Sequence, residues 1–284
     1  MRVLLTGATG FVGSSVLKAL VAGGHEVTAV VRSQAGADLV TGEGATAVIH
    51  PLPDTEWLAM QLRDTDGFIH AATPEDDRGA FDDALLDAVF DAYNGTQKHY
   101  VHTGGVWVHG PGWDITEDTP INAPEATAWR EPREQRVLRA DFVGSVIEPG
   151  IVYGYGKGIP ATITAAPKTG TGALLLVGGG DQHWTTIHVD DLADLYVKVL
   201  EEAPGGERYL GVNGDNPTVR EIGLAVVGPD GEVAAEDEAA SIARLGGDFA
   251  RALFLDQQAT GRKARLTFGW APSRPSLVEE LRAR

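Results

Sequence analysis

The 284-residue sequence contains no cysteine. This absence excludes disulfides, thiolate metal sites and a cysteine nucleophile, and it fits a reducing compartment. Basic residues are also scarce, because 23 lysines and arginines face 40 aspartates and glutamates, giving a formal net charge of −17. The basic residues are scattered along the chain. We therefore expect no nucleic-acid partner and no attraction to an anionic membrane.

Long apolar runs are missing as well. No segment approaches the roughly 20 consecutive apolar residues of a membrane span, and the apolar run near the first residue is too short for a signal peptide. We expect a cytoplasmic protein whose partner is a small molecule, and the sequence does not indicate an oligomeric state. Because 43% of the residues are apolar, a chain of this length can bury a full core.

Short apolar runs recur along the first half of the chain, separated by segments with helical spacing. The predicted strands are Arg2–Thr6, Val27–Val31, Ala45–Ile49, Gly67–Ala71, His99–Thr103 and Val143–Ile147. Helical spacing is clear over residues 11–22, where a glycine pair ends the pattern, and over 82–93. This alternation predicts an α/β fold with a parallel sheet covered by helices on both faces.

Three glycines follow the first predicted strand with the spacing Gly7-x-x-Gly10-x-x-Gly13. The first permits a tight turn, the second lets a phosphate approach the backbone, and the third lets the following helix pack on the strand. The N–H groups and the dipole at the start of that helix then attract an anion. A strand, a glycine turn and a helix in this order predict a dinucleotide site in a Rossmann-type, doubly wound sheet.

The end of the second predicted strand indicates which dinucleotide binds. An acidic residue there would bind the ribose 2′-hydroxyl, whereas a basic residue accommodates a 2′-phosphate. The chain has Arg32 followed by Ser33, and a guanidinium and a hydroxyl both suit phosphate. We therefore predict NADP(H), with an ordinary exposed surface arginine as the alternative reading of Arg32.

The alternation of strands and helices loosens after about residue 150 into glycine-rich segments, and helical spacing returns over 190–200 and 218–226. We predict a single domain over 1–284. Its cofactor-binding part would cover about 1–150 plus 180–200. A smaller C-terminal substrate-binding lobe would cover about 151–180 and 205–284.

Segments spread over nearly the whole chain carry a resemblance to a known family. They are Thr6–Gly13, Asp66–Ala72, Val101–Gly110, Ile147–Gly154, Ile187–Ala193 and Phe268–Pro272. With these segments the chain resembles an atypical or extended short-chain dehydrogenase/reductase of the NAD(P)-dependent epimerase/dehydratase type. The resemblance implies that hydride passes between nicotinamide C4 and a carbonyl or alcohol carbon.

The resemblance also implies which residues contact the cofactor. Residues 71–73 would follow the ribose and phosphates, 149–152 would run beside the nicotinamide, and Leu52 would back the adenine. Together with the glycine turn and the second strand, the predicted cofactor-binding residues are Gly7, Thr9, Gly10, Phe11, Val12, Arg32, Ser33, Leu52, Ala71, Ala72, Thr73, Thr103, Arg133, Pro149, Gly150, Ile151 and Val152.

The family's catalytic serine, tyrosine and lysine have no counterparts at the matching positions. Gly105 stands where the serine belongs, and the Tyr-x-x-x-Lys pattern falls on Trp129 and Arg133. An indole N–H donates a hydrogen bond but does not release a proton near neutral pH. Arg133 keeps the ability to bind ribose hydroxyls. The resemblance therefore implies a binding site without the usual proton donor.

Four histidines, at positions 102, 109, 183 and 188, are candidates for a substitute acid. His102 lies on a strand predicted to be buried on both faces, which favours a hydrogen-bonded core role. His188 lies in a family segment where the resemblance implies a structural role. His109 is the histidine for which a substrate contact is predicted. No cluster of histidines or carboxylates has metal-ligand spacing, so no metal site is expected.

Tryptophans gather in segments that are predicted to border the substrate. They are typical either of core packing or of an apolar wall for a flat aromatic substrate, and the two adjacent glycines at 104 and 105 would widen the same site. The predicted substrate-contacting residues are Gly104, Gly105, Trp107, His109, Trp113, Trp129 and Tyr153.

Two functions from different classes fit these features. The first is an NADPH-dependent ketoreductase that reduces a bulky, polycyclic aromatic ketone of the polyketide type, with the proton taken from water or from a substrate hydroxyl. General acid catalysis contributes about 10²–10⁴-fold, so its loss slows turnover without preventing it. A resemblance to atypical reductases of antibiotic pathways favours this function. The alternative is a non-catalytic NADP(H)-binding protein with a redox-sensing or regulatory role.

Overall fold

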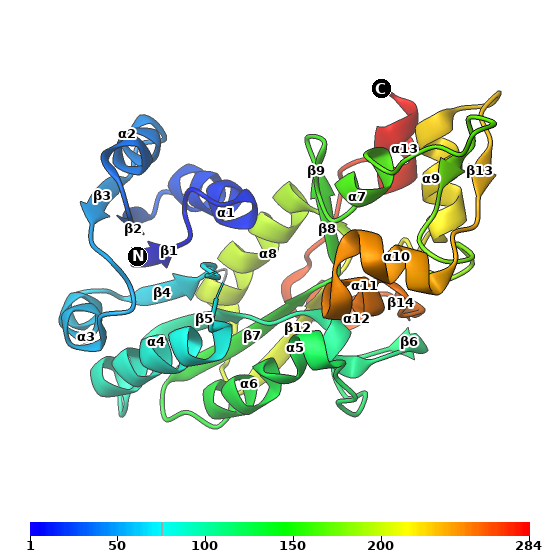
Figure 1. Cartoon of the computed structure of the whole chain (residues 1–284). Helices are drawn as coiled ribbons and strands as arrows, with labels where there is room; N and C mark the ends of the chain where they lie inside the picture. Colours follow the sequence, from blue (N-terminus) through cyan, green and yellow to red (C-terminus); the bar gives the residue numbers. More distant parts are fainter. Residues whose placement is uncertain (75) are drawn as a thin grey trace.

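At the centre of the computed structural model, which describes residues 1–74 and 76–284, lies a seven-stranded parallel sheet (Figure 1). The strand order is β12-β7-β5-β4-β1-β2-β3. Strand order reverses between β1 and β4, and ligands of such sheets bind outside the carboxyl ends of the strands at that point. The strands are β1 (Arg2–Thr6), β2 (Glu26–Val31), β3 (Thr46–Ile49), β4 (Gly67–His70), β5 (His99–Thr103), β7 (Val143–Pro149) and β12 (Glu207–Gly211).

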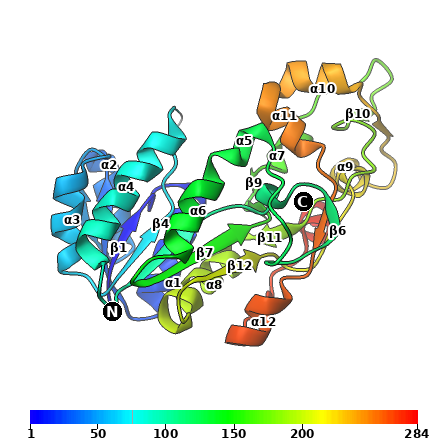
Figure 2. The same ribbon diagram turned by 90° about the horizontal axis from the view of Figure 1, so that it is seen from below.

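Helices cover both faces of this sheet, because successive strand residues point to opposite sides. Val3 and Leu5 pack with one set of helices, whereas Leu4 between them packs with the other. Figure 2 shows α4 and α6 on one side of the strands and α1 and α8 on the other. The predicted doubly wound α/β sheet is confirmed. The helices are α1 (Phe11–Ala22), α2 (Gln34–Gly42) and α8 (Val189–Glu202) on one face, and α3 (Thr55–Arg63), α4 (Arg78–Tyr93) and α6 (Arg130–Leu138) on the other.

The position of strand β12 differs from the predicted division of the chain into a cofactor-binding part and a substrate lobe. The sequence analysis assigns residues 205–284 to the substrate lobe, but β12 pairs in parallel with β7 along its whole length and completes the central sheet. Phe268 and Trp270 pack into the same core as α1 and α8. The chain therefore returns to the sheet after leaving the lobe, and this long-range pairing has no local sequence signal.

The smaller lobe lies to the right in Figure 1 and is built from short elements. Strand β8 follows β7 directly and pairs in parallel with β11 and antiparallel with β9. Trp184 is buried in the core of this lobe. Within the described part of the chain, no helix combines the length and the apolar character that a membrane crossing needs. The remaining elements are β6 (Gly112–Ile115), α5 (Glu125–Ala128), β8 (Ile151–Gly154), β9 (Lys157–Gly158), α7 (Ala161–Thr164), β10 (Leu174–Leu175), β11 (Thr186–His188), α9 (Val219–Val227), β13 (Val233–Ala234), α10 (Glu238–Leu245), α11 (Gly247–Leu253), β14 (Gln257–Ala259), α12 (Arg262–Phe268) and α13 (Leu277–Arg282).

A buried cluster of charged residues joins β12, β7 and α6. Arg208 Nη1 lies 3.2 Å from Glu148 Oε1, and Arg208 Nη2 lies 3.9 Å from Glu134 Oε2. The other oxygen of Glu148 lies 2.8 Å from Nε2 of His109. Both glutamate side chains are fully buried. The cluster holds α6, and with it the segment 129–133, against the carboxyl ends of the strands.

This cluster predicts a pH-dependent stability. Burial, and after it the neighbouring Glu148 carboxylate, raises the pKa of Glu134 above its ordinary value of 4.5. A carboxyl group whose pKa is higher in the folded than in the unfolded chain is protonated on folding, so its stabilising effect is lost as the pH rises. Glu134→Gln, which cannot ionise, should therefore gain stability over the wild type between pH 5 and pH 8, on the order of 1 kcal/mol or more.

Urea unfolding of both proteins at the two pH values measures this difference. Glu131→Gln is the matched control, because Glu131 is exposed on the same helix. If the difference in free energy of unfolding between Glu134→Gln and the wild type did not grow with pH, the pKa of Glu134 would not be raised by folding.

Candidate functional site

The turn between β1 and α1 is held tightly against β4. Gly7 has φ +79°, and a Cβ placed on it would lie 2.4 Å from the carbonyl oxygen of Ala71. A Cβ on Gly13 would lie 2.1 Å from the carbonyl oxygen of Gly7. No side chain fits at either position without moving the backbone. The structural roles predicted for the first and third glycines are confirmed.

Gly10 lies directly before α1, at the N-cap position of the helix. No side chain of the described residues caps the first turn of α1, so its N–H groups face outward with the positive end of the helix dipole. A Cβ on Gly10 would contact only its own turn, at 3.2 Å from Gly7 O. This arrangement fits a phosphate group that approaches the backbone closely.

The glycine turn borders a groove of about 750 Å³, called here the turn groove. Ten of the predicted cofactor residues line it, namely Gly7, Thr9, Gly10, Phe11, Val12, Arg32, Leu52, Ala71, Ala72 and Thr73. The sequence analysis did not identify the other lining residues, Thr6, Val30, Val31, His50, Pro53, Pro74, Asp76, Asp77, Ala80 and Phe81. Most of these come from strand ends and from the start of α4, and only the fold brings them to the groove.

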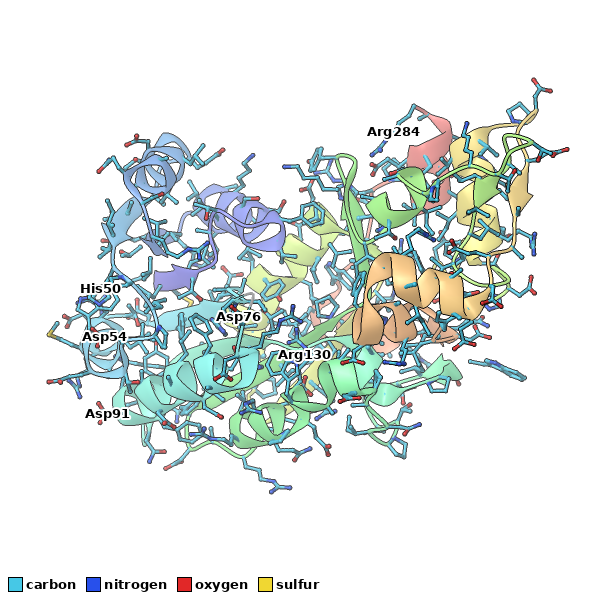
Figure 3. The ribbon with its side chains drawn as sticks, in the orientation of Figure 1. His50, Asp54, Asp76, Asp91, Arg130 and Arg284 are labelled. Atoms are coloured by element: carbon cyan, nitrogen blue, oxygen red, sulfur yellow. The ribbon has the colours of Figure 1, made fainter. Side chains whose placement is uncertain are left out.

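Arg32 and Ser33 have different surroundings at the end of β2. Arg32 lines the turn groove and is exposed. Ser33 lies outside the lining, and its hydroxyl oxygen accepts a hydrogen bond from Gly36 N at 3.2 Å, which caps α2. His50 closes another part of the groove, stacked on Trp57 with ring centroids 3.8 Å apart. Its Nε2 lies 3.0 Å from Asp54 Oδ2. Both residues are labelled at the left of Figure 3.

A second, larger space of about 1070 Å³, called here the central cavity, adjoins the turn groove. The two share Val12, Asp77 and Ala80. Residues 149–152, predicted to lie beside the nicotinamide, line this cavity, as do Thr103 and Arg133. No tyrosine, lysine or histidine of the described residues lines it. The central cavity therefore offers none of these three side chains as a proton donor, and the acidic residues of its lining are Asp77, Asp83, Glu125 and Asp248.

Trp129 and Arg133 line the central cavity, but contacts within the protein hold both side chains. The indole N–H of Trp129 donates to the carbonyl oxygen of Ala126 at 3.1 Å. Arg133 donates through Nη1 to Trp129 O at 2.6 Å and forms an ion pair with Asp83 through Nη2. Two of the donors expected to bind ribose are thus already used.

The residues at the end of β5 shape the floor of the central cavity. A Cβ on Gly105 would meet no atom within 4 Å, so glycine leaves room that a serine side chain would fill. A Cβ on Gly104 would lie 2.5 Å from Glu134 Oε1, so this glycine is required by packing. The Thr103 hydroxyl donates to His70 O at 2.6 Å and lies 2.7 Å from the hydroxyl of Tyr196. Thr103 is therefore part of a buried network as well as of the lining.

The structure places three predicted substrate residues away from the central cavity. His109 is buried below it, and both ring nitrogens are used, one by a backbone carbonyl at 2.9 Å and one by Glu148. Trp113 is 81% exposed on β6. Tyr153 is buried, and its hydroxyl donates to a backbone carbonyl at 2.7 Å. The structure does not bring these three side chains to the central cavity, because a local pattern does not show which way a side chain points.

The predictions that His102 and His188 are structural residues are confirmed. His102 has no exposed surface, and its Nδ1 lies 3.0 Å from the hydroxyl of Tyr100. Burial lowers the pKa of His102 to about 3, so the ring is neutral in the fold. His188 accepts a hydrogen bond from Asp190 N at 3.1 Å and caps α8. Neither histidine lines the central cavity.

Aromatic and cationic residues face the central cavity together. Trp107 and Trp129 line it as predicted, and Phe249 from α11 joins them, with its ring centroid 6.1 Å from that of Trp107. Arg130 also lines the cavity and is labelled near the centre of Figure 3. Neither Phe249 nor Arg130 was singled out in the sequence analysis. Phe249 lies far along the chain in a short helix. Arg130 lies between Trp129 and Arg133, and the sequence analysis considered only those two residues because they fall on the family's Tyr-x-x-x-Lys pattern.

Known proteins share both the sequence and the fold of this chain. Residues 7–113, from the glycine turn into β6, match a protein family described as NAD(P)H-binding. The 4-hydroxy-2-methyl-3-oxo-4-farnesyl-3,4-dihydroquinoline-1-oxide ketoreductase of Stigmatella aurantiaca is 30% identical over 233 residues, which cover 75% of this chain and 69% of that protein.

Two solved structures have the same architecture over nearly all of the chain. The UDP-glucose 4-epimerase of Thermus thermophilus, in complex with NAD, has a TM-score of 0.75 at 20% identity and covers 99% of this chain and 97% of its own. The human epimerase family protein SDR39U1 (isoform 2), with NADPH, has a TM-score of 0.74 at 22% identity and covers 100% and 98%. At these identities the likeness shows the fold.

The ketoreductase relationship extends over most of both proteins, and the family match falls on the part of the chain that forms the turn groove. The chain belongs to the short-chain dehydrogenase/reductase superfamily, as an atypical, epimerase/dehydratase-like member with an NAD(P)H-binding domain.

Proposed function

We propose that the protein is an NADPH-dependent ketoreductase that reduces a bulky, flat aromatic ketone of the polyketide type. The observation that carries this proposal is the continuity of the turn groove with the central cavity through Val12, Asp77 and Ala80. A dinucleotide lying along the groove would reach the cavity with its nicotinamide end. A carbonyl group in the cavity would then lie beside it.

Bound NADPH would supply the hydride. The start of α1 would bind the pyrophosphate, and Arg32 would bind the 2′-phosphate that distinguishes NADPH from NADH. Residues 149–152 would flank the nicotinamide ring from the side of the lobe. Trp107 and Trp129 would hold a flat substrate and exclude water, and Phe249 would extend the same wall.

The proton would come from water or from a hydroxyl group of the substrate itself. What supports this source is that no tyrosine or lysine, the residues of the family's usual acid, is among the described residues that line the central cavity. Positioning of the reactants accounts for a larger share of rate enhancement than general acid catalysis does. The relationship to the Stigmatella ketoreductase supports carbonyl reduction, and the open space at Gly105 supports a bulky substrate.

The direct test incubates the purified protein with NADPH and a panel of hydroxylated polycyclic aromatic ketones, and follows NADPH absorbance and product masses. We expect at least one ketone to be converted to its alcohol with equal consumption of NADPH. Saturable NADPH binding with no turnover across the panel would favour a non-catalytic, redox-sensing or regulatory cofactor binder instead.

Arg32 predicts the cofactor preference. Arg32→Ala should weaken NADPH binding on the order of 10- to 100-fold, because one charge-assisted contact contributes about 1.5–3 kcal/mol, and should leave NADH binding nearly unchanged. Calorimetric titration with each cofactor measures both constants. Arg63→Ala is the control, because Arg63 lies on α3 outside the groove and pairs with Asp91. Equal affinities of the wild type for the two cofactors would overturn the assignment of NADPH.

Restoring the family's usual pair should not accelerate the reaction. In the double variant Trp129→Tyr with Arg133→Lys, the new side chains replace residues that are oriented by contacts within the protein. Trp129 donates a hydrogen bond to Ala126 O, and Arg133 pairs with Asp83. We expect kcat for the best ketone of the panel to stay the same or fall. An increase of about 10² or more, the size of a general acid contribution, would show that the missing acid limits turnover.

A further inference from the structure

Arg130 is held in a fixed position at the wall of the central cavity. Its Nη1 donates to the carbonyl oxygen of Thr103 at 2.8 Å, at the end of β5. Its guanidinium carbon lies 4.5 Å from the ring centroid of Trp129, in a cation–π contact. Both contacts orient the planar group without adding a negative charge to it.

Arg130 makes no direct ion pair with the described residues. No carboxylate of the described residues lies within 4 Å of its guanidinium, and its Nε and Nη2 make no hydrogen bond to those residues. Arg133, one turn along α6, differs because Asp83 pairs with it. Glu134 and Asp82 act on Arg130 from longer distances. Burial raises the pKa of Glu134, which reduces its negative charge near neutral pH, whereas the pKa of Asp82 is lowered, despite burial, by its hydrogen bond to His70, so Asp82 stays ionised.

A half-buried guanidinium with two free donors is suited to an anion. Burial lowers the pKa of Arg130, but an arginine side chain stays protonated at neutral pH. Arg78 and Arg133 line the same cavity, as do Asp77, Asp83, Glu125 and Asp248. Arg133 pairs with Asp83, whereas Arg130 has no carboxylate of the described residues within 4 Å. Its Nε and Nη2 donors form a planar fork that matches one or two oxygens of a flat acidic group.

We propose that Arg130 is the specificity-determining residue of the central cavity, and that it binds an ionised oxygen of the substrate: a phenolate, an enolate or a carboxylate carried on a flat ring system. This inference rests on the proposed function and narrows its substrate class to acidic aromatic ketones. Trp129 would contact the ring plane on one side of the bound oxygen. Because the substrate's acidic group would bind as the anion, water is left as the proton source.

The test measures binding rather than turnover, so that its failure and the failure of the ketoreductase proposal can be told apart. Protein loaded with NADP⁺ is titrated with 2-hydroxy-1,4-naphthoquinone, with its 2-methoxy ether and with 2-naphthoic acid, by calorimetry at pH 7. We expect at least one of the two acids to bind about 10- to 100-fold more tightly than the ether. The acid that binds more tightly shows whether a ring oxygen or a carboxylate is preferred.

Variants assign this preference to one side chain. Arg130→Met should abolish the preference for the acid, Arg130→Lys should keep part of it, and NADP⁺ affinity should stay unchanged in both. Arg136→Met is the matched control, because Arg136 lies on the same helix, outside the cavity lining, and pairs with Asp87. If the wild type bound the acids and the ether with equal affinity, the proposal would be overturned. This comparison uses the wild type alone and does not depend on the folding of any variant. A preference that persists in Arg130→Met would overturn it as well.

Discussion

The close packing of the β1–α1 turn against β4 is the constraint on which the site depends. Gly7 and Gly13 have no room for a side chain, because the backbone of Ala71 and of the turn itself already fills that space. This contact brings the ends of β1 and β4 together where the strand order reverses. It also leaves the first turn of α1 open toward the turn groove. A dinucleotide can follow the groove only because these backbone segments lie so close.

The central cavity depends on a second set of contacts, those that hold α6. Arg208 from the edge strand lies between the buried carboxyl groups of Glu148 and Glu134, and Arg133 pairs with Asp83 on α4. These interactions fix the segment 129–133 at the wall of the central cavity. This segment presents the indole of Trp129 and the guanidinium of Arg130 to the cavity.

Local patterns predicted much of the fold. Alternating strands and helices gave the parallel sheet, and the glycine spacing gave the turn, because both depend on residues close together in the sequence. Position along a strand also predicted that His102 is a hydrogen-bonded core residue. Strand β12 was missed as part of the sheet, because its partner β7 lies about 60 residues earlier in the chain.

The side chains around the cavity were predicted less well. His109 and Tyr153 point into the protein, and Trp113 lies on the surface, although all three stand in or near family motifs. Arg130 and Phe249 reach the cavity from different elements, and only the tertiary structure brings them together. Orientation and long-range proximity decide a binding site, and neither has a signature in a short stretch of sequence.

The central claim is that this chain positions a carbonyl group beside the nicotinamide for direct hydride transfer. The most direct measurement uses NADPH carrying deuterium at nicotinamide C4, in separate samples for its two faces, with mass spectrometry of the reduced ketone. We expect deuterium at the former carbonyl carbon from one labelled face and none from the other. A reduced product that contains no deuterium from either face would contradict it.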